Sequence, residues 1–105
     1  AICTEPCERV FRGLPGVVRC ALVGLGAAGA QVPALVVQPT RRMSWDEEEA
    51  FALVLRDRAL EFDGTKEIAQ FFFHPNFPVD VRHNAKIHRL ALARWASRAR
   101  PHRFP

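Results

Sequence analysis

Along the first third of the chain, the apolar residues change from a helical to a strand period. Thr4-Glu5-Pro6 is typical of a helix start, because a proline in the first turn loses no hydrogen bond. Pro15-Gly16 ends this helix, and the apolar runs at 17–23 and 32–37 predict two strands. The predicted helix has an apolar face with four members: Cys7, Val10, Phe11 and Leu14.

Between the two strands, Gly24-x-Gly26-x-x-Gly29 has the spelling of a dinucleotide-binding loop. Such a loop requires a helix directly after the glycines, because the N–H groups of the helix start bind the pyrophosphate. Here Pro33 and a valine-rich run follow, which favour a second strand. We therefore predict a β-hairpin with a glycine-rich turn and no cofactor site at this position.

A second helix is predicted from residue 44 to about Glu61. Ser44-x-x-Glu47 has the spacing of a capping box, and Asp63-Gly64 is a stop signal. Residues 65–70 are expected to form a short polar turn or helix, followed by a buried strand at 71–73 and a loop at 76–80. Four residues of the helix are expected to point inward: Ala50, Phe51, Val54 and Leu55.

The last predicted helix is capped by Asn84, and the tail 100–105 is expected to fray. The chain as a whole, residues 1–105, is predicted to be a single small α+β domain, a short sheet with a hairpin and about three flanking helices. The expected apolar face of the last helix has four members: Ile87, Leu90, Ala91 and Trp95.

Length and composition allow one modest core in 105 residues that are 49% hydrophobic. No apolar run approaches the ~20 residues that a membrane-spanning helix needs, and we see no targeting segment. The start at Ala1 without a methionine suggests a piece of a longer protein. Cys3, Cys7 and Cys20 are odd in number and lack CxxC spacing, so we expect buried thiols in a reducing cytoplasm.

The net charge of +4 is unevenly distributed. Acidic residues gather between residues 46 and 63, whereas residues 81–105 contain six arginines, one lysine and no acidic residue. A basic final helix suits an anionic partner, so a nucleic-acid-binding module is one alternative. A solvated helix face and a pure scaffold domain are the others.

The basic stretch from His74 to Arg89 is the candidate for chemistry. Lys86 lies near the start of its predicted helix, where a cation is unfavourable for the helix dipole, so an anion site is one interpretation and a solvated lysine the other. We do not expect His74, His83 and His88 to bind a metal. They are expected to cap loops or to lie at the surface.

The phrase Pro78-Val-Asp-Val-Arg-His-Asn-Ala-Lys-Ile-His-Arg89 resembles the last motif of the adenylate-forming enzymes, Pro-x-Thr-x-x-Gly-Lys-Ile-x-Arg. Asn84-Ala85 stands where that motif has Thr-Gly. Upstream, 5–11 and 14–24 are similar to the helix, turn and strand of the same family, so the resemblance covers roughly residues 5–96. The spelling around Lys86 looks most like the olefin β-lactone synthetase branch.

The resemblance implies the C-terminal lid domain of a longer enzyme, whose large N-terminal domain binds ATP and Mg²⁺. Lys86 is then the adenylation lysine, which contacts the substrate carboxylate and the α-phosphate of ATP. Arg82, His83 and Asn84 are neighbouring candidates for contacts to the nucleotide. Arg89 is expected to anchor the helix or to pair with the large domain. The isolated domain is expected to be inactive.

In the lactone branch, the substrate implied by the resemblance is a long-chain 2-alkyl-3-hydroxy acid, which is adenylated and then cyclised in a cytoplasmic olefin pathway. The domain then rotates between the two half-reactions. A long-chain acyl-CoA ligase is the alternative within the family. Implied partners are the large domain and other olefin-pathway enzymes, without nucleic acid. Asp80 is expected to hold the loop before Lys86, while residues 71–73 and Trp95 are expected to be core.

Overall fold

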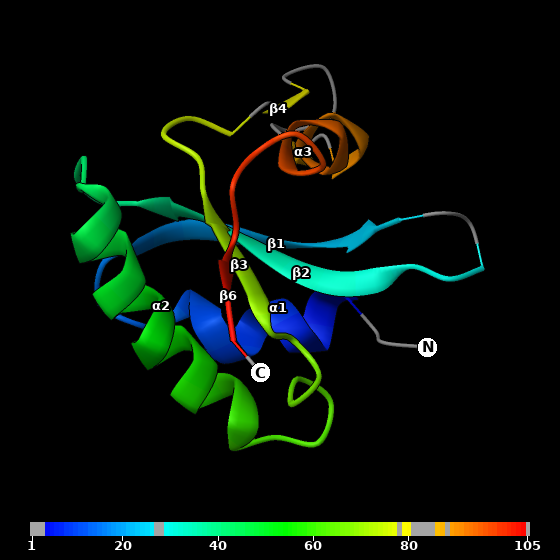
Figure 1. The fold of residues 1–105 in the computed structure, drawn as a ribbon, viewed down its shortest axis with the longest axis horizontal. Helices are drawn as coiled ribbons and strands as arrows, with labels where there is room; N and C mark the ends of the chain where they lie inside the picture. The colour runs from blue at the N-terminus through cyan, green and yellow to red at the C-terminus, as the bar shows by residue number, and fades with distance from the viewer. Residues whose placement is uncertain (1–3, 27–28, 78, 81–85, 88, 105) are drawn as a thin grey trace.

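A computed structural model describes residues 4–26, 29–77, 79–80, 86–87 and 89–104. A mixed sheet has helices on both sides, with α1 and α2 on one side and α3 on the other (Figure 1). The elements in chain order are α1 (Thr4–Arg12), β1 (Val17–Leu25), β2 (Val32–Pro39), α2 (Trp45–Leu60), β3 (Gln70–Phe73), β4 (Val79–Asp80), β5 (Lys86–Ile87), α3 (Arg89–Ala96) and β6 (His102–Arg103). The predicted α+β class is confirmed.

The main sheet has the strand order β1-β2-β3-β6, and β4 and β5 form a separate two-stranded ladder. β1 and β2 are antiparallel, with Leu22 opposite Leu35. β2 and β3 are parallel because α2 carries the chain across the sheet between them. The predicted hairpin is confirmed, and Gly26 and Gly29 in its turn have φ values of 102° and 85°, which glycine adopts without a Cβ penalty.

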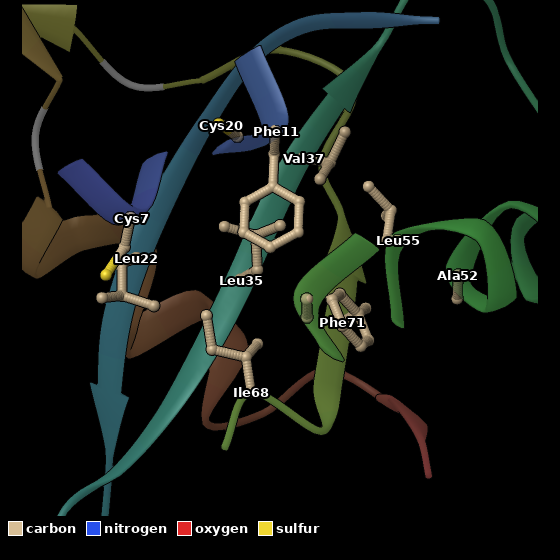
Figure 2. Close-up of a cluster of buried hydrophobic side chains, with 11 residues drawn as sticks. Cys7, Phe11, Cys20, Leu22, Leu35, Val37, Ala52, Leu55, Ile68 and Phe71 are labelled. Carbon is tan, nitrogen blue, oxygen red and sulfur yellow. The ribbon is translucent and has the colours of Figure 1, made fainter. Parts of the chain in front are cut away.

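Successive residues of the strands point to opposite faces, so the sheet carries two hydrophobic cores. The α1/α2 core (Figure 2) contains Cys7, Phe11, Cys20, Leu22, Leu35, Val37, Ala52, Leu55, Ala59, Ile68 and Phe71. The α3 core contains Ala21, Val23, Ala34, Val36, Phe72, Phe77, Leu92 and Ala96. Both faces are buried, which explains why the strands are almost continuously apolar.

The capping box of α2 forms as predicted. The Ser44 hydroxyl accepts a hydrogen bond from the Glu47 N–H at 3.2 Å, and the Glu47 carboxylate accepts one from the Ser44 N–H at 3.0 Å. After the helix, the buried Thr65 hydroxyl donates to the Ala59 carbonyl oxygen at 2.6 Å, which satisfies an end carbonyl. These contacts define both ends of α2.

The predicted inward face of α2 is wrong in two positions, since Ala50 and Val54 are exposed. Ala52, Leu55 and Ala59 are buried instead. The buried stripe of α2 is therefore narrower than the number of apolar residues in the helix suggests. Leu53, Val54 and Leu60 consequently face outward.

The prediction that the tail frays is also wrong. β6 pairs antiparallel with β3, with Phe71 opposite His102, and the Phe104 N–H donates to the Ala69 carbonyl oxygen at 2.9 Å. His102 is buried, stacks on Trp45 with ring centroids 3.8 Å apart, and lies 3.1 Å from the Glu48 carboxylate. The tail is ordered by these tertiary contacts and not by local propensity.

Candidate functional site

Lys86 lies in a strand and not in a helix. β5 pairs antiparallel with β4, so that Val79 is opposite Ile87 and Asp80 is opposite Lys86. The prediction of a helix capped by Asn84 is therefore wrong, and the argument from an unfavourable helix dipole does not apply to Lys86.

The last helix begins at Arg89, five residues later than the predicted cap. Ile87 is β-branched and fits the extended ladder, whereas Leu92 and Ala96 are the residues that α3 buries. Leu90, predicted to be buried, is 59% exposed. The helical face was misplaced because the prediction began the period at Ile87.

Several predicted site residues lie outside the described residues. They are Arg82, His83, Asn84 and His88, so their assignments stay predictions. Cys3 also lies outside the described residues. For Asp80 and Lys86 the backbone positions are described, and the ladder places them opposite one another.

Arg89 anchors the start of α3, as one of its two predicted roles required. Its guanidinium makes two hydrogen bonds to the carboxylate of Glu8 in α1, at 2.6 Å from Nη1 to Oε2 and 2.8 Å from Nη2 to Oε1. The Leu22 N–H in β1 donates to the same Oε2 at 2.7 Å. Glu8 is only 1% exposed, so a buried carboxylate joins α1, β1 and α3.

Sequence reasoning missed Glu8. It lies in the apolar stripe of α1 between Cys7 and Phe11, both of which are buried. A carboxylate on the buried side of a helix requires a charged or hydrogen-bonding partner. That requirement is the signal that could have identified it, although the sequence does not reveal which arginine is the partner.

The carboxylate of Glu8 also influences the thiol of Cys20, whose Sγ donates to the Glu8 carbonyl oxygen at 3.4 Å. Burial, with a further contribution from the negative charge of Glu8, raises the pKa of Cys20 to about 12. The thiol is therefore neutral at physiological pH and unsuited to nucleophilic attack. The prediction that Cys7 and Cys20 are small buried residues is confirmed.

His74 lies at the edge of the α3 core. Its Nδ1 accepts a hydrogen bond from the Asn76 N–H at 3.1 Å, as expected for a loop-capping histidine. Its ring packs edge-on against Trp95, with centroids 4.6 Å apart, and burial lowers its pKa. Trp95 also packs against Phe72, which confirms the predicted core role of both residues.

The arginines described in the C-terminal third, from Arg89 onward, do not gather into one phosphate-binding group. Arg89 is used inside the fold by Glu8, and the Arg100 guanidinium lies 4.4 Å from the ring centroid of Trp45. Arg94, Arg98 and Arg103 are exposed on α3 and the segment that follows it. The charge is therefore distributed over several surfaces.

A shallow groove of about 590 Å³ lies where β2 leads into α2. Its described lining includes Thr40, Arg41, Arg42 and Phe73. The Arg41 guanidinium lies 2.8 Å from the Glu47 carboxylate. The pKa of Glu47 is lowered, mainly by the hydrogen bond from the Ser44 N–H and then by Arg41. None of the described lining residues belongs to residues 79–87, which are called the Lys86 segment below.

Within the described part of the chain, no group of three or more His, Cys, Asp or Glu side chains is arranged to hold a metal ion. In the same residues, no helix has the length and apolar character required to cross a bilayer.

Two curated proteins resemble the chain over most of its length. Olefin beta-lactone synthetase of Stenotrophomonas maltophilia is 50% identical over 94 residues, which is 90% of this chain. The protein of the same name from Xanthomonas campestris pv. campestris is 41% identical over 97 residues, which is 92% of this chain. The chain spans 17% of the length of each of these relatives. No protein-family model matches the chain.

Solved structures with a similar fold include a benzoate CoA ligase from Burkholderia xenovorans, with a TM-score of 0.68 and 21% identity over 84% of this chain and 17% of that chain. Another is o-succinylbenzoate CoA synthetase from Bacillus subtilis in complex with an acyl-adenylate intermediate. It has a TM-score of 0.63 and 23% identity over 90% of this chain and 17% of that chain. The chain thus shares the fold of part of these two ligases and is homologous to a segment of two proteins named olefin beta-lactone synthetase.

Proposed function

We propose that the chain is the C-terminal domain of a longer ATP-dependent, AMP-forming enzyme that converts a long-chain 2-alkyl-3-hydroxy acid to a β-lactone in olefin biosynthesis. The observation that carries the proposal is the 50% identity to a protein named olefin beta-lactone synthetase over 90% of the chain. The motif containing Lys86 supports it, and within that motif the β4–β5 ladder pairs Asp80 with Lys86.

In the first half-reaction, a carboxylate oxygen of the substrate attacks the α-phosphorus of ATP. The bond from this phosphorus to the bridging oxygen breaks, and pyrophosphate leaves with the electron pair. Negative charge accumulates on the α-phosphoryl oxygens and the leaving group. An ammonium group delivered by Lys86 would stabilise that charge more strongly in the transition state than in the ground state, which raises kcat.

In the second half-reaction, the 3-hydroxyl oxygen of the substrate attacks the acyl carbonyl carbon. The hydroxyl proton is lost, the bond from this carbon to the phosphate oxygen breaks, and AMP leaves as the four-membered lactone closes. No external thiol is consumed. We expect the Mg²⁺ that accompanies ATP to be held by the remainder of the enzyme.

The test uses the full-length protein that carries this chain, with ATP, Mg²⁺ and a long-chain 2-alkyl-3-hydroxy acid but no coenzyme A. We expect Lys86→Ala to lower the kcat of pyrophosphate release by roughly 10²–10³-fold, the range for loss of one electrostatic stabiliser. Lys66→Ala is the matched control, because Lys66 is the other lysine of the chain and forms a solvent-exposed 3.7 Å ion pair with Asp63.

Lactone as the product of the unmodified protein would support the cyclisation step. Pyrophosphate release that yields product only when coenzyme A is added would instead assign an acyl-CoA ligase. Equal rates for the Lys86→Ala protein and the unmodified protein would contradict the adenylation role of this lysine.

A further inference from the structure

The buried carboxylate of Glu8 has no role in the chemistry proposed above, yet it is connected to the segment that carries Lys86. Both of its oxygens are engaged: Oε1 accepts from Arg89, and Oε2 accepts from Arg89 and from the Leu22 N–H. A carboxylate has the acceptor capacity for these three donors, and the planar guanidinium matches its geometry. The contact therefore fixes both the orientation of the Arg89 guanidinium and its distance from the Glu8 carboxylate.

Stability alone is a weak reason for such a contact. Burying the Glu8 carboxylate carries a desolvation cost, although Arg89 remains 37% exposed, and well-packed apolar residues of similar size often stabilise a fold as well as a buried ion pair does. What a bidentate pair supplies in addition is a single geometry. In this fold, that geometry joins the first helix and the first strand to the first residue of α3.

Lys86 is three positions before Arg89, and β5 ends at Ile87. Downstream, α3 is held to the sheet by the buried side chains of Leu92 and Ala96. Upstream, the contact of β5 that the structure describes is the short ladder with β4. On its C-terminal side, the Lys86 segment consequently joins the body of the domain beside the Glu8–Arg89 contact.

We propose that Glu8 and Arg89 are positioning residues that act through Lys86. This inference rests on the proposed function. Electrostatic stabilisation depends on the placement of the charged group, and a displacement of about 1 Å by a remote substitution can cost ~10²-fold in rate. The pair is thus expected to affect adenylation without contacting ATP or the acid.

Glu8→Gln tests the inference with little change in shape. An amide has one oxygen in place of two, so Arg89 and the Leu22 N–H compete for it. The amide NH₂ group is itself a donor and cannot accept a hydrogen bond from Arg89. In the full-length protein, we expect the kcat of pyrophosphate release to fall by about 10–10²-fold, with less than about a 3-fold change in KM for ATP. Glu61→Gln is the matched control, because it breaks the exposed 2.9 Å pair with Arg58.

A double-mutant cycle distinguishes positioning of Lys86 from general damage. If Glu8 acts through Lys86, Glu8→Gln should have little further effect on the residual rate of the Lys86→Ala protein. An equal fold-loss in both backgrounds would overturn the inference, as would an unchanged kcat for Glu8→Gln alone. A Lys86→Ala protein with the rate of the unmodified protein would contradict the proposed role of the lysine itself. This outcome can be distinguished from failure of the positioning role because Lys86→Ala is measured on its own.

Arg89→Lys provides a second variant in case Glu8→Gln prevents folding. It keeps the positive charge and loses the bidentate geometry, so the thermal midpoint should change little. The kcat of pyrophosphate release should fall in the otherwise unmodified protein and change little in the Lys86→Ala background. Unaltered kcat in a folded Arg89→Lys protein would contradict the inference.

Discussion

Among the described residues, more buried side chains pack on one face of the sheet than on the other. The α1/α2 core contains Phe11, Leu35, Leu55, Ile68 and Phe71, all with no exposed surface. In the α3 core, three of the eight buried members are alanines. The first face therefore buries more apolar side chains and gains more from their burial, whereas the second packs against the short helix α3.

This difference has a consequence for the Lys86 segment, which precedes α3. A helix of eight residues that buries two side chains cannot be located by packing at both of its ends. The polar contact between Glu8 and Arg89 supplies the missing constraint at the N-terminal end. A residue of α1, on the side of the larger core, thus locates the start of α3, on the other side of the sheet (Figure 1).

The largest expected effect is at Phe71, in the α1/α2 core. Phe71→Ala removes a fully buried ring that packs edge-on against Phe104, so we expect a loss of about 3–5 kcal/mol in the free energy of unfolding. Urea unfolding measures it. Phe62→Ala, at a ring that is 42% exposed, is the control, and an equal loss there would contradict the assignment of Phe71 to the main core.

A smaller effect is expected from enlarging a residue of the α3 core. Ala34→Leu adds three carbons at a position with no exposed surface, which should cost about 1–3 kcal/mol by overpacking. Because α3 must move away, the fluorescence of Trp95 should also change, measured in a Trp45→Phe background. Ala50→Leu on the exposed side of α2 should leave both properties nearly unchanged, and identical behaviour of the two variants would refute the close-packing argument.

The smallest effect concerns the pH dependence of the α3 core. Burial lowers the pKa of His74 below its ordinary value of 6.5, so the unfolded chain binds the proton more tightly than the folded protein does. Stability from this residue is complete above pH 6.5 and is lost as the pH falls from there through the folded pKa. Urea midpoints between pH 7.5 and pH 5 should fall less steeply for His74→Gln, and parallel curves would contradict this origin.

Much of the main sheet could be predicted from the sequence because its signals are local. The valine-rich runs, the glycine turn and the Ser44–Glu47 capping box each determine structure within a few residues. The C-terminal third depends on distant partners instead. β6 is two residues long and includes an arginine, so its strand conformation follows from pairing with β3 and not from propensity.

The candidate site shows the same limit. Lys86 could be identified by the motif around it, but its strand conformation depends on pairing with β4, which a helical period through Ile87 obscured. The partnership of Glu8 with Arg89 could not be predicted, because the sequence offers thirteen arginines and no rule that selects one. Tertiary geometry supplies that choice.

The Glu8–Arg89 contact also bears on the order in which the domain folds. The two residues are 81 positions apart, whereas the β1–β2 hairpin joins residues that are close in sequence. Closing a long loop costs more chain entropy than closing a short one, and distant contacts generally form later. We therefore expect the Lys86 segment to reach its final place last, after the sheet that supports it has formed.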